Sequence, residues 1–347
     1  MIAQTFGPNG FGTYRVEFGR GEVTLSPVER PFEVTLVPGF VDIHIHGAFG
    51  IDFMECSASE MDVLAGRLEA CGYETFLPTT VTASSEEVQS ALKKLRANTD
   101  FHLEGPFISP AFPGAQPPEC IIDAPLGPSE WDTILSDPRL KVITLAPEVP
   151  HALELIARLT ERGVVVSMGH TNATYDEARF GFEFGARHTT HTFNAMRPLH
   201  HREAGVLGYA LQQDAMACEI IYDRKHVSRQ AASLLLKVKP EDKVIAVSDS
   251  TKATGLPAGQ EIMMWGHKCV TGRDEVRLAS NGALAGSAIT LLESFKYLAE
   301  DFGVETAIRC CSINPRKALR MSGPPRVYAV FDKDLRLVEV RRIADNP

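Results

Sequence analysis

A repeated alternation of buried strands and amphipathic helices is the feature that most limits how this chain can fold. Between about residues 37 and 250, eight short apolar runs of strand length alternate with segments of helical periodicity. Eight such units over roughly 210 residues fit an α/β fold of the closed (β/α)8 type better than an open doubly wound sheet. The predicted strands are 37–45, 74–78, 101–103, 142–145, 164–168, 188–190, 217–222 and 244–247.

The two ends of the chain show a different pattern, in which apolar and polar residues alternate over short stretches. Residues 13–18 and 32–36 suit half-exposed strands, and residues 326–341 suit a hairpin. Residues 262–270 also read as short strands, which we expect to return to the N-terminal sheet. The prediction is a small β-sandwich-like domain of residues 1–37, 260–283 and 325–347, beside a TIM-like barrel of residues 38–259 and 284–324.

Composition excludes several classes of partner. The net charge of −9 argues against nucleic acid and against an anionic membrane surface. The N-terminus has no signal-peptide pattern, and no run approaches the ~18 apolar residues of a membrane span, so we predict a cytoplasmic protein. The seven cysteines include no Cys-x-x-Cys pair, which favours reduced thiols over disulfides or a cysteine zinc site.

The first barrel strand ends in the sequence His44-Ile45-His46. Side chains alternate along a strand, so both imidazoles project from the same face. Paired histidines at the end of a buried strand are typical of a metal site, although a single such pattern also occurs as two unrelated polar residues.

Histidine or acidic residues stand at four further strand ends, and this repetition favours the metal site. Barrel enzymes carry their chemistry at the carboxyl ends of the strands. One candidate ligand set is Glu104, His170 and His191, and a second consists of His44, His46 and Asp249. Glu104 would either ligate one ion or bridge two. These donors suit zinc or iron, and they also accept manganese or cobalt.

Three protein ligands leave a position open for water, which predicts hydrolysis. Asp249 is the candidate general base, and its alternative role is to cap the turn that follows it. His102 fits either a supporting position or a structural one, and His188 fits a structural one. Arg202, Arg224, Lys225 and His226 are local cations that suit a phosphate or carboxylate, unless they are merely solvated.

Seven motifs in order resemble the amidohydrolase superfamily, most closely its branch that deacetylates N-acetylglucosamine 6-phosphate. They are residues 38–47, 102–107, 169–174, 190–196, 247–249, 284–287 and 314–315. The resemblance implies that Glu104, His170 and His191 hold the principal divalent ion and that Asp249 is the catalytic acid and base. Some members of the family bind a second ion through the His-x-His pair.

The resemblance also implies a substrate, a phosphorylated amino sugar, and a homodimer. It implies that the backbone of Asn194 and Ala195 meets the phosphate, that Arg202 and His226 contact the phosphate and sugar, and that Ala115 lies in a sugar-contacting loop. One cation of the family reaches across the dimer interface. This chain departs from the pattern at Gln116, where many relatives carry His, and this change is expected to alter a sugar contact.

Three alternatives remain open from the sequence. The same scaffold also hydrolyses other N-acyl amino sugars and cyclic amides. The end of strand four carries Leu145-Ala-Pro-Glu148, with no lysine to become a carboxylated metal bridge, which disfavours a cyclic-amide substrate. A metal-stabilised, non-catalytic binding protein is the third alternative, and the retention of Asp249 beside a full ligand set argues against it.

Overall fold

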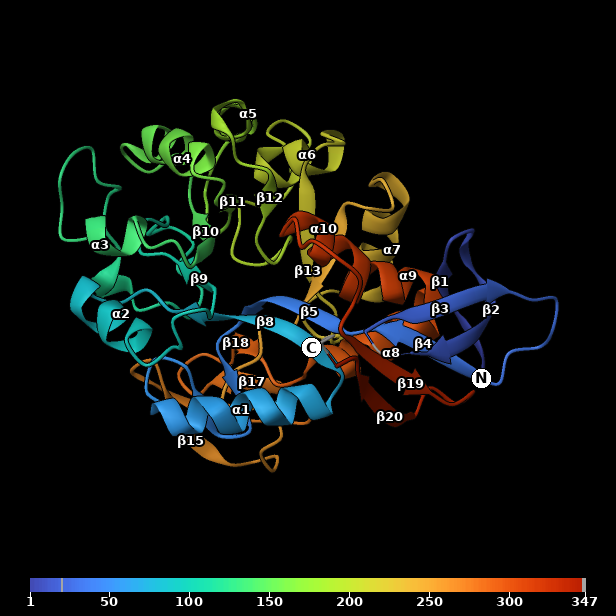
Figure 1. Ribbon diagram of the computed structural model, residues 1–347. Coiled ribbons are helices and arrows are strands. Elements are labelled where there is room, and N and C mark those ends of the chain that lie inside the picture. The colour runs from blue at the N-terminus through green and yellow to red at the C-terminus, as the bar shows by residue number, and fades with distance from the viewer. Residues whose placement is uncertain (20, 345–347) are drawn as a thin grey trace.

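The barrel predicted from the sequence forms the centre of the molecule (Figure 1). The computed structural model describes residues 1–19 and 21–344, so Arg20 and residues 345–347 of the predicted small domain lie outside the described residues. All eight predicted strands are confirmed, in one parallel sheet that follows the order of the chain. They are β5 (Phe40–Ile45), β8 (Tyr73–Thr80), β9 (Phe101–Glu104), β10 (Leu140–Leu145), β11 (Val165–Met168), β12 (His188–Thr189), β13 (Ala217–Ile221) and β14 (Val244–Val247).

The sheet closes between its first strand and the segment that follows its last strand. The backbone N–H of Asp249 donates to the carbonyl oxygen of His44 at 2.9 Å, and that of His46 donates to Ser250 at 2.9 Å. Closure therefore sets two candidate ligand segments side by side.

Helices cover the outside of the barrel. Four of them, α1, α2, α5 and α8, begin with a capping box, in which a Ser or Thr and a Glu three residues later exchange hydrogen bonds with backbone N–H groups. The helices are α1 (Ala58–Ala70), α2 (Ser85–Leu92), α3 (Asp132–Leu135), α4 (Ala152–Glu161), α5 (Tyr175–Phe184), α6 (Gly205–Gln212), α7 (Arg229–Val238), α8 (Leu291–Phe302), α9 (Val304–Ile308) and α10 (Asn314–Ala318), with a 3-10 turn at Pro118–Cys120 and a π-helical turn at Arg309–Ile313.

The main hydrophobic core lies between the barrel strands and these helices. Ile143 and Leu145 of β10, for example, belong to the same buried cluster as Leu155 and Ile156 of α4. Within residues 1–19 and 21–344, no helix is long and apolar enough to cross a membrane.

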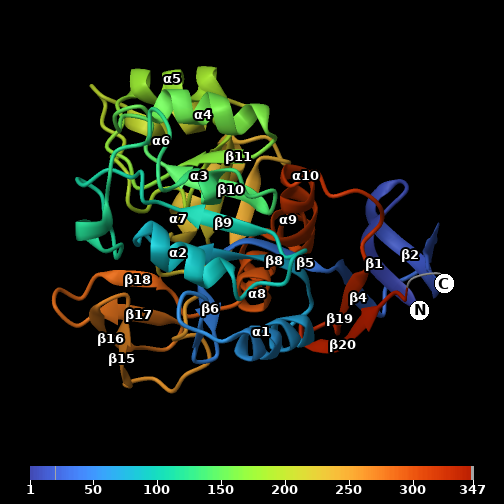
Figure 2. The ribbon, with the colours of Figure 1, turned by 60° about the vertical axis from the view of Figure 1, so that its left-hand side comes forward.

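Both ends of the chain build one mixed sheet, as predicted, with strand order β20-β19-β4-β1-β2-β3. Figures 1 and 2 show it at one side of the barrel. Only Gly39 separates β4 from β5, so the small sheet leads directly into the strand that carries His44. The strands are β1 (Ile2–Gly7), β2 (Gly10–Phe18), β3 (Val23–Pro27), β4 (Val34–Pro38), β19 (Val327–Phe331) and β20 (Leu337–Arg342).

Residues 260–283 do not join that sheet, and this part of the prediction is wrong. They form three strands that pair with β18 in a separate four-stranded antiparallel sheet, well apart from the sheet of the chain ends (Figures 1 and 2). Alternating residues identify a strand but not its partner, and here the tight turn at 265–266 favours local pairing. The strands are β15 (Glu261–Met264), β16 (His267–Thr271), β17 (Glu275–Leu278) and β18 (Leu284–Ser287), and a short hairpin of β6 (Gly47–Ala48) and β7 (Ile51–Asp52) follows β5. The boundaries of the two predicted domains stay a prediction.

Candidate metal centre

The candidate metal centre lies at the carboxyl ends of five barrel strands, where side chains line a cavity of about 180 Å³. Glu104 is the last residue of β9, and His46 follows β5 directly. His170, His191 and Asp249 each lie two residues beyond a strand and have left-handed backbone, with φ of 47°, 30° and 46°. Because this conformation is strained for residues other than glycine, its recurrence at three strand ends indicates side chains held for function.

The first group consists of Glu104, His170 and His191, as predicted. Oε1 of Glu104 lies 3.2 Å from Nε2 of His170 and 3.2 Å from Nε2 of His191. The two Nε2 atoms are 3.1 Å apart. All three side chains are buried, and their donor atoms converge on one point.

The second group shares Glu104 with the first. Nε2 of His44 and Nε2 of His46 are 3.2 Å apart, so the two imidazoles do face the same way. They lie 3.3 Å and 3.2 Å from the two carboxylate oxygens of Glu104. Oδ1 of Asp249 is 3.2 Å from Nε2 of His46 and 3.5 Å from Nε2 of His44.

Backbone carbonyls orient three of the imidazoles. Each Nδ1 atom lies at hydrogen-bond distance from a carbonyl oxygen and can donate its proton there, which leaves Nε2 free to bind a metal. The pairs are His46 with Thr79 at 3.1 Å, His170 with Phe112 at 3.0 Å and His191 with Asn194 at 3.2 Å.

His44 has different surroundings, because its Nδ1 faces a buried carboxylate that was not predicted from the sequence. Oε2 of Glu219 lies 3.8 Å from Nδ1 of His44, which is within ion-pair distance, and neither atom has a hydrogen-bond partner. The other oxygen, Oε1, is 3.4 Å from Nδ1 of His188, which gives His188 its structural role. A glutamate in the middle of the apolar run at 217–221 was the signal that should have identified it.

His102 also supports the metal centre, through contacts with β5, β10 and the ring of His44. Its Nδ1 lies 3.0 Å from the carbonyl oxygen of Ile43, and its Nε2 lies 2.8 Å from the hydroxyl of Thr144. The ring packs edge-on against His44, with centroids 4.7 Å apart. Burial and the charge of His44 lower the pKa of His102 to about 3, so the ring is neutral and both nitrogens are already engaged.

The carboxylates and imidazoles of the centre shift one another's pKa. Burial lowers the pKa of His46, but hydrogen bonds to Asp249 and Glu104 outweigh burial and raise it to about 9. Burial raises the pKa of Asp249, whereas its hydrogen bond to His46 and nearby histidine charges bring it below its usual value. The charge of His44 likewise overcomes burial and holds the pKa of Glu104 low. Both carboxylates are therefore ionised at neutral pH.

This donor set fits a divalent cation. Two ionised carboxylates and four imidazoles converge within bonding reach of one or two points, and uncompensated burial of so many polar groups would be costly. Zinc or iron as the identity of the ion, and one ion against two, stay predictions.

Gln116 bonds the shared carboxylate. Its side-chain amide donates to Oε2 of Glu104 at 2.6 Å, and its carbonyl oxygen accepts from the backbone N–H of Thr82 at 2.7 Å. We expected this residue to alter a sugar contact. It lines the cavity, and it also holds a candidate ligand in place.

The predicted substrate contacts divide into two groups. Ala115, Asn194, Ala195 and His226 line the cavity beside the metal centre. Arg202 is exposed on the sixth loop, where Nη1 contacts Nε2 of His201 at 2.8 Å, and it is not among the residues that line the cavity.

The two other predicted cations, Arg224 and Lys225, have different surroundings. Arg224 is bound to Asp301 and Glu300, at 2.7 Å and 2.9 Å, and its guanidinium lies over the ring of Tyr297. Lys225 is exposed.

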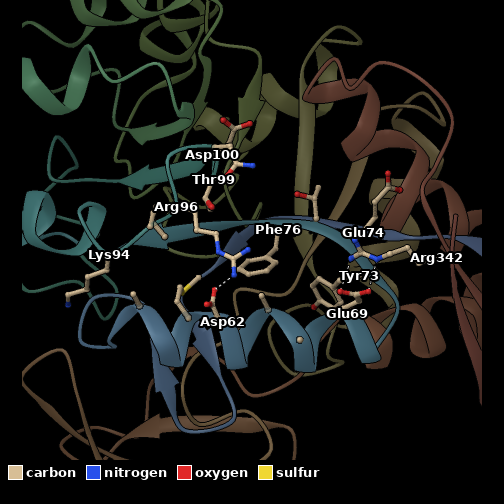
Figure 3. A pocket seen from close by; sticks show the side chains of 17 residues that line it. Asp62, Glu69, Tyr73, Glu74, Phe76, Lys94, Arg96, Thr99, Asp100 and Arg342 are labelled. Carbon is tan, nitrogen blue, oxygen red and sulfur yellow. Dashed lines mark hydrogen bonds and ion pairs between the residues drawn. The ribbon is translucent and has the colours of Figure 1, made fainter. Parts of the chain in front are cut away.

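A larger cavity, of about 620 Å³, lies elsewhere, between α1 and the start of β8. Figure 3 shows Arg96 and Asp62 turned toward one another across it, with 2.7 Å between Nη2 and Oδ1. At its other end Arg342 pairs with Glu69 at 2.7 Å. Both of its arginines are paired with carboxylates of its own lining and no histidine lines it, so its size does not make it the chemical site.

Comparison with known proteins gives consistent matches. Residues 35–324 match the model of the amidohydrolase family. The N-acetylglucosamine-6-phosphate deacetylase of Bacillus subtilis (strain 168) is 38% identical over 288 residues, 79% of this chain and 72% of the relative. The N-acetylgalactosamine-6-phosphate deacetylase of Escherichia coli O157:H7 is 33% identical, over 87% of this chain and 82% of the relative.

A solved structure is similar over almost its whole length. It is an alanine variant of the N-acetyl-D-glucosamine-6-phosphate deacetylase from Mycobacterium smegmatis, in complex with N-acetyl-D-glucosamine 6-phosphate. The TM-score is 0.89 at 28% identity, covering 99% of this chain and 97% of that chain.

Proposed function

This chain belongs to the amidohydrolase family, and we propose that it hydrolyses the N-acetyl group of N-acetylglucosamine 6-phosphate, giving acetate and glucosamine 6-phosphate. The observation that carries the proposal is the convergence of Glu104, His170 and His191 beside the ionised Asp249. A relative of similar fold, solved with this substrate bound, supports the same substrate here.

The proposed metal ligands are Glu104, His170 and His191, with His44, His46 and Asp249 available for a second ion. A divalent ion held there supplies Lewis acidity, which polarises the acetamide carbonyl and acidifies a water molecule. Glu219, His102 and the carbonyls behind the imidazoles fix the ligand orientation, so that little reorganisation is needed during the reaction.

Asp249 is the proposed catalytic acid and base. Its carboxylate is ionised and its Oδ1 faces the imidazoles of His44 and His46, so it can accept a proton from the attacking water. The same oxygen then donates that proton to the amine nitrogen as the C–N bond breaks. Atoms balance, because one water is consumed and acetate and the free amine are formed.

The phosphate of the substrate is expected to need a cationic contact. No Lys or Arg is among the described residues that line the cavity, and Arg202 is exposed on the sixth loop. We therefore propose a homodimer in which Arg202 of one copy reaches the substrate of the other, beside Asn194, Ala195 and His226. The molar mass in solution tests the dimer.

Two further parts of the function stay proposals. N-acetylgalactosamine 6-phosphate is the second candidate substrate, because a relative that is 33% identical carries that name. We place the reaction in the cytoplasm, since a phosphorylated sugar is charged and crosses a bilayer poorly.

An acetate-release assay decides between these functions. We expect metal-loaded protein to release acetate from N-acetylglucosamine 6-phosphate faster than from its galactosamine analogue or from unphosphorylated N-acetylglucosamine. Faster release from the galactosamine analogue would mean that N-acetylgalactosamine 6-phosphate is the substrate instead. No acetate from any N-acetyl sugar at full metal loading would favour the non-catalytic binding protein.

Replacing Asp249 by Asn should lower kcat about 10²- to 10⁴-fold, because the amide cannot accept and return the proton. The other ligands are unchanged, so elemental analysis should still find the principal ion. The matched control is Asp214→Asn, which changes an exposed aspartate and should leave kcat unchanged. Near-normal turnover of Asp249→Asn would remove Asp249 from the mechanism.

A further inference from the structure

The hairpin between β15 and β16 places an aromatic residue where its backbone conformation is unfavourable. Met264 pairs with His267, so Trp265 and Gly266 form a two-residue turn, with φ of 52° and 78°. Such turns need positive φ at both positions and are dominated by Asn and Gly. A tryptophan in left-handed backbone persists only where other contacts stabilise it, and we look for these contacts at its side chain.

The indole of Trp265 is held against the metal centre. Its ring packs edge-on against the imidazole of His46, with centroids 5.0 Å apart. Its Nε1–H donates at 3.1 Å to Oδ2 of Asp52, a buried carboxylate whose Oδ1 accepts from the backbone N–H of Met54. The ring is therefore held both by an aromatic contact and by a hydrogen bond.

The four-stranded sheet is attached directly to the mouth of the cavity. The backbone N–H of Ser287, at the end of β18, donates to the carbonyl oxygen of Asp249 at 2.7 Å. Trp265 and Leu284 of β18 both line the cavity, and Trp265 packs against the core of this sheet. One wall of the cavity is thus apolar and is joined to the metal centre by a backbone hydrogen bond.

Trp265 lies on the flank of the centre away from the proposed contact Asn194. Trp265 contacts His46, whereas Asn194 contacts His191, and Glu104 lies between these two histidines. A secondary amide is planar and trans, so its acyl carbon and its N-substituent point in opposite directions. With the sugar on the Asn194 flank, the acyl chain points toward Trp265.

We propose that Trp265 is a specificity-determining residue that closes the acyl side of the cavity and restricts the N-acyl group to acetyl. This inference rests on the proposed function and adds the residue that sets its acyl selectivity. The apolar wall suits a methyl group, and we expect the indole to obstruct a chain two carbons longer.

The test compares N-acetyl-, N-propionyl- and N-butyrylglucosamine 6-phosphate as substrates. In the wild type we expect kcat/KM to fall about 100-fold or more from acetyl to butyryl. Trp265→Gly, which suits the turn, should reduce that ratio about tenfold or more, mainly by improving butyryl turnover. Trp265→Phe retains the bulk and should retain the preference. Met263→Ala, on the exposed side of the same hairpin, is the matched control and should behave as wild type.

Three results would overturn the proposal. They are an unchanged preference in folded Trp265→Gly, an equal change in Met263→Ala, and wild-type protein that accepts butyryl as readily as acetyl. If the protein hydrolyses a different N-acetyl amine, the proposed function has failed, and the same acyl series built on that amine still tests Trp265.

A binding measurement covers the case in which Trp265→Gly does not fold. The chain has two tryptophans, and Trp131 is buried against Phe107, so the emission difference between wild type and Trp265→Phe isolates Trp265. Acetate added to the metal-loaded wild type should change this emission at concentrations at which butyrate does not. Equal responses to the two carboxylates, or no response to acetate, would overturn the proposal.

Discussion

Gln116 shows how one residue tunes the candidate centre. The amide of Gln116 donates to the same oxygen of Glu104 that lies 3.2 Å from Nε2 of His46, and it is buried. A bonded carboxylate keeps its orientation between the two ligand groups, which lowers the cost of binding an ion. Gln116, at which this chain departs from the family pattern, therefore bonds a candidate metal ligand and also lines the cavity.

Gln116→Met should weaken metal affinity about 10- to 100-fold, because a similar volume is kept while the donor to Glu104 is lost. Competition with a chelator of known affinity measures this change. The control is Gln230→Met, an exposed glutamine at the start of α7. Affinity within twofold of wild type would mean that Glu104 keeps its orientation without this hydrogen bond.

At the scale of single residues, the sequence predicted the residues that end strands and offered His102 as a supporting residue, but it did not reveal Glu219 or Trp265. His44, His46, Glu104, His170, His191 and Asp249 share one simple signal, a ligand side chain at a strand end. Glu219 and Trp265 have no such signal. Glu219 is recognised through its contacts with His44 and His188, and Trp265 through Asp52 and His46. These partners lie far away in the sequence.

Among the elements, α6 has weak helical signals in its own sequence, and its stability comes from contacts with other segments. Its eight residues include Gly205 and Gly208, and it has no side-chain N-cap. Its C-terminal end is capped by Lys239, from the segment after α7. The ammonium group donates to the carbonyl oxygens of Ala210 and Gln213 at 2.8 Å and 2.6 Å. A cation at that end also suits the helix dipole.

Lys239→Met should lower the free energy of unfolding by about 1–3 kcal/mol, because it removes two charge-assisted hydrogen bonds and leaves their carbonyls unpaired. Urea denaturation measures the change. Lys237→Met, two residues away on the exposed face of α7, should change it by less than about 0.5 kcal/mol. Equal effects of the two substitutions would show that hydrophobic replacement, rather than loss of the cap, is responsible.

Strand pairing between distant segments was the part of the fold that the sequence specified least. The pairing of β4 with β19 joins residues 34–38 to 327–331 and was predicted only in outline. Residues 260–283 carry the same alternation, yet they pair locally because Trp265 and Gly266 make a tight turn. Periodicity defines elements, whereas turn chemistry and packing select their partners.

For the whole molecule, the metal centre ties the barrel together. Its candidate ligands lie at the ends of β5, β9, β11, β12 and β14, so an ion bound there would link strands on several sides of the ring. An ion that binds only the folded protein stabilises it by RT ln(1 + [M]/Kd), or about 2.7 kcal/mol at a free concentration of 100 Kd. Stability should therefore depend on metal loading across the whole barrel.

Removal of the metal with a chelator should lower Tm by several degrees, and more so at pH 8 than at pH 6. His46, with its pKa of about 9, and His44, whose pKa is also raised because the charge of Glu104 outweighs burial, hold protons in the metal-free centre. These protonated imidazoles stabilise the metal-free fold fully below an unfolded-state pKa near ~6.5, and that contribution is lost as pH rises toward 9. Protons also compete with the ion, so metal affinity increases over the same range. Both effects increase the difference in Tm between metal-loaded and metal-free protein as pH increases.

Calorimetry at the two pH values, with elemental analysis of each sample, measures this difference in Tm. A difference of equal size at pH 6 and pH 8 would show that the histidines near Glu104 and Asp249 are not protonated when the metal is removed.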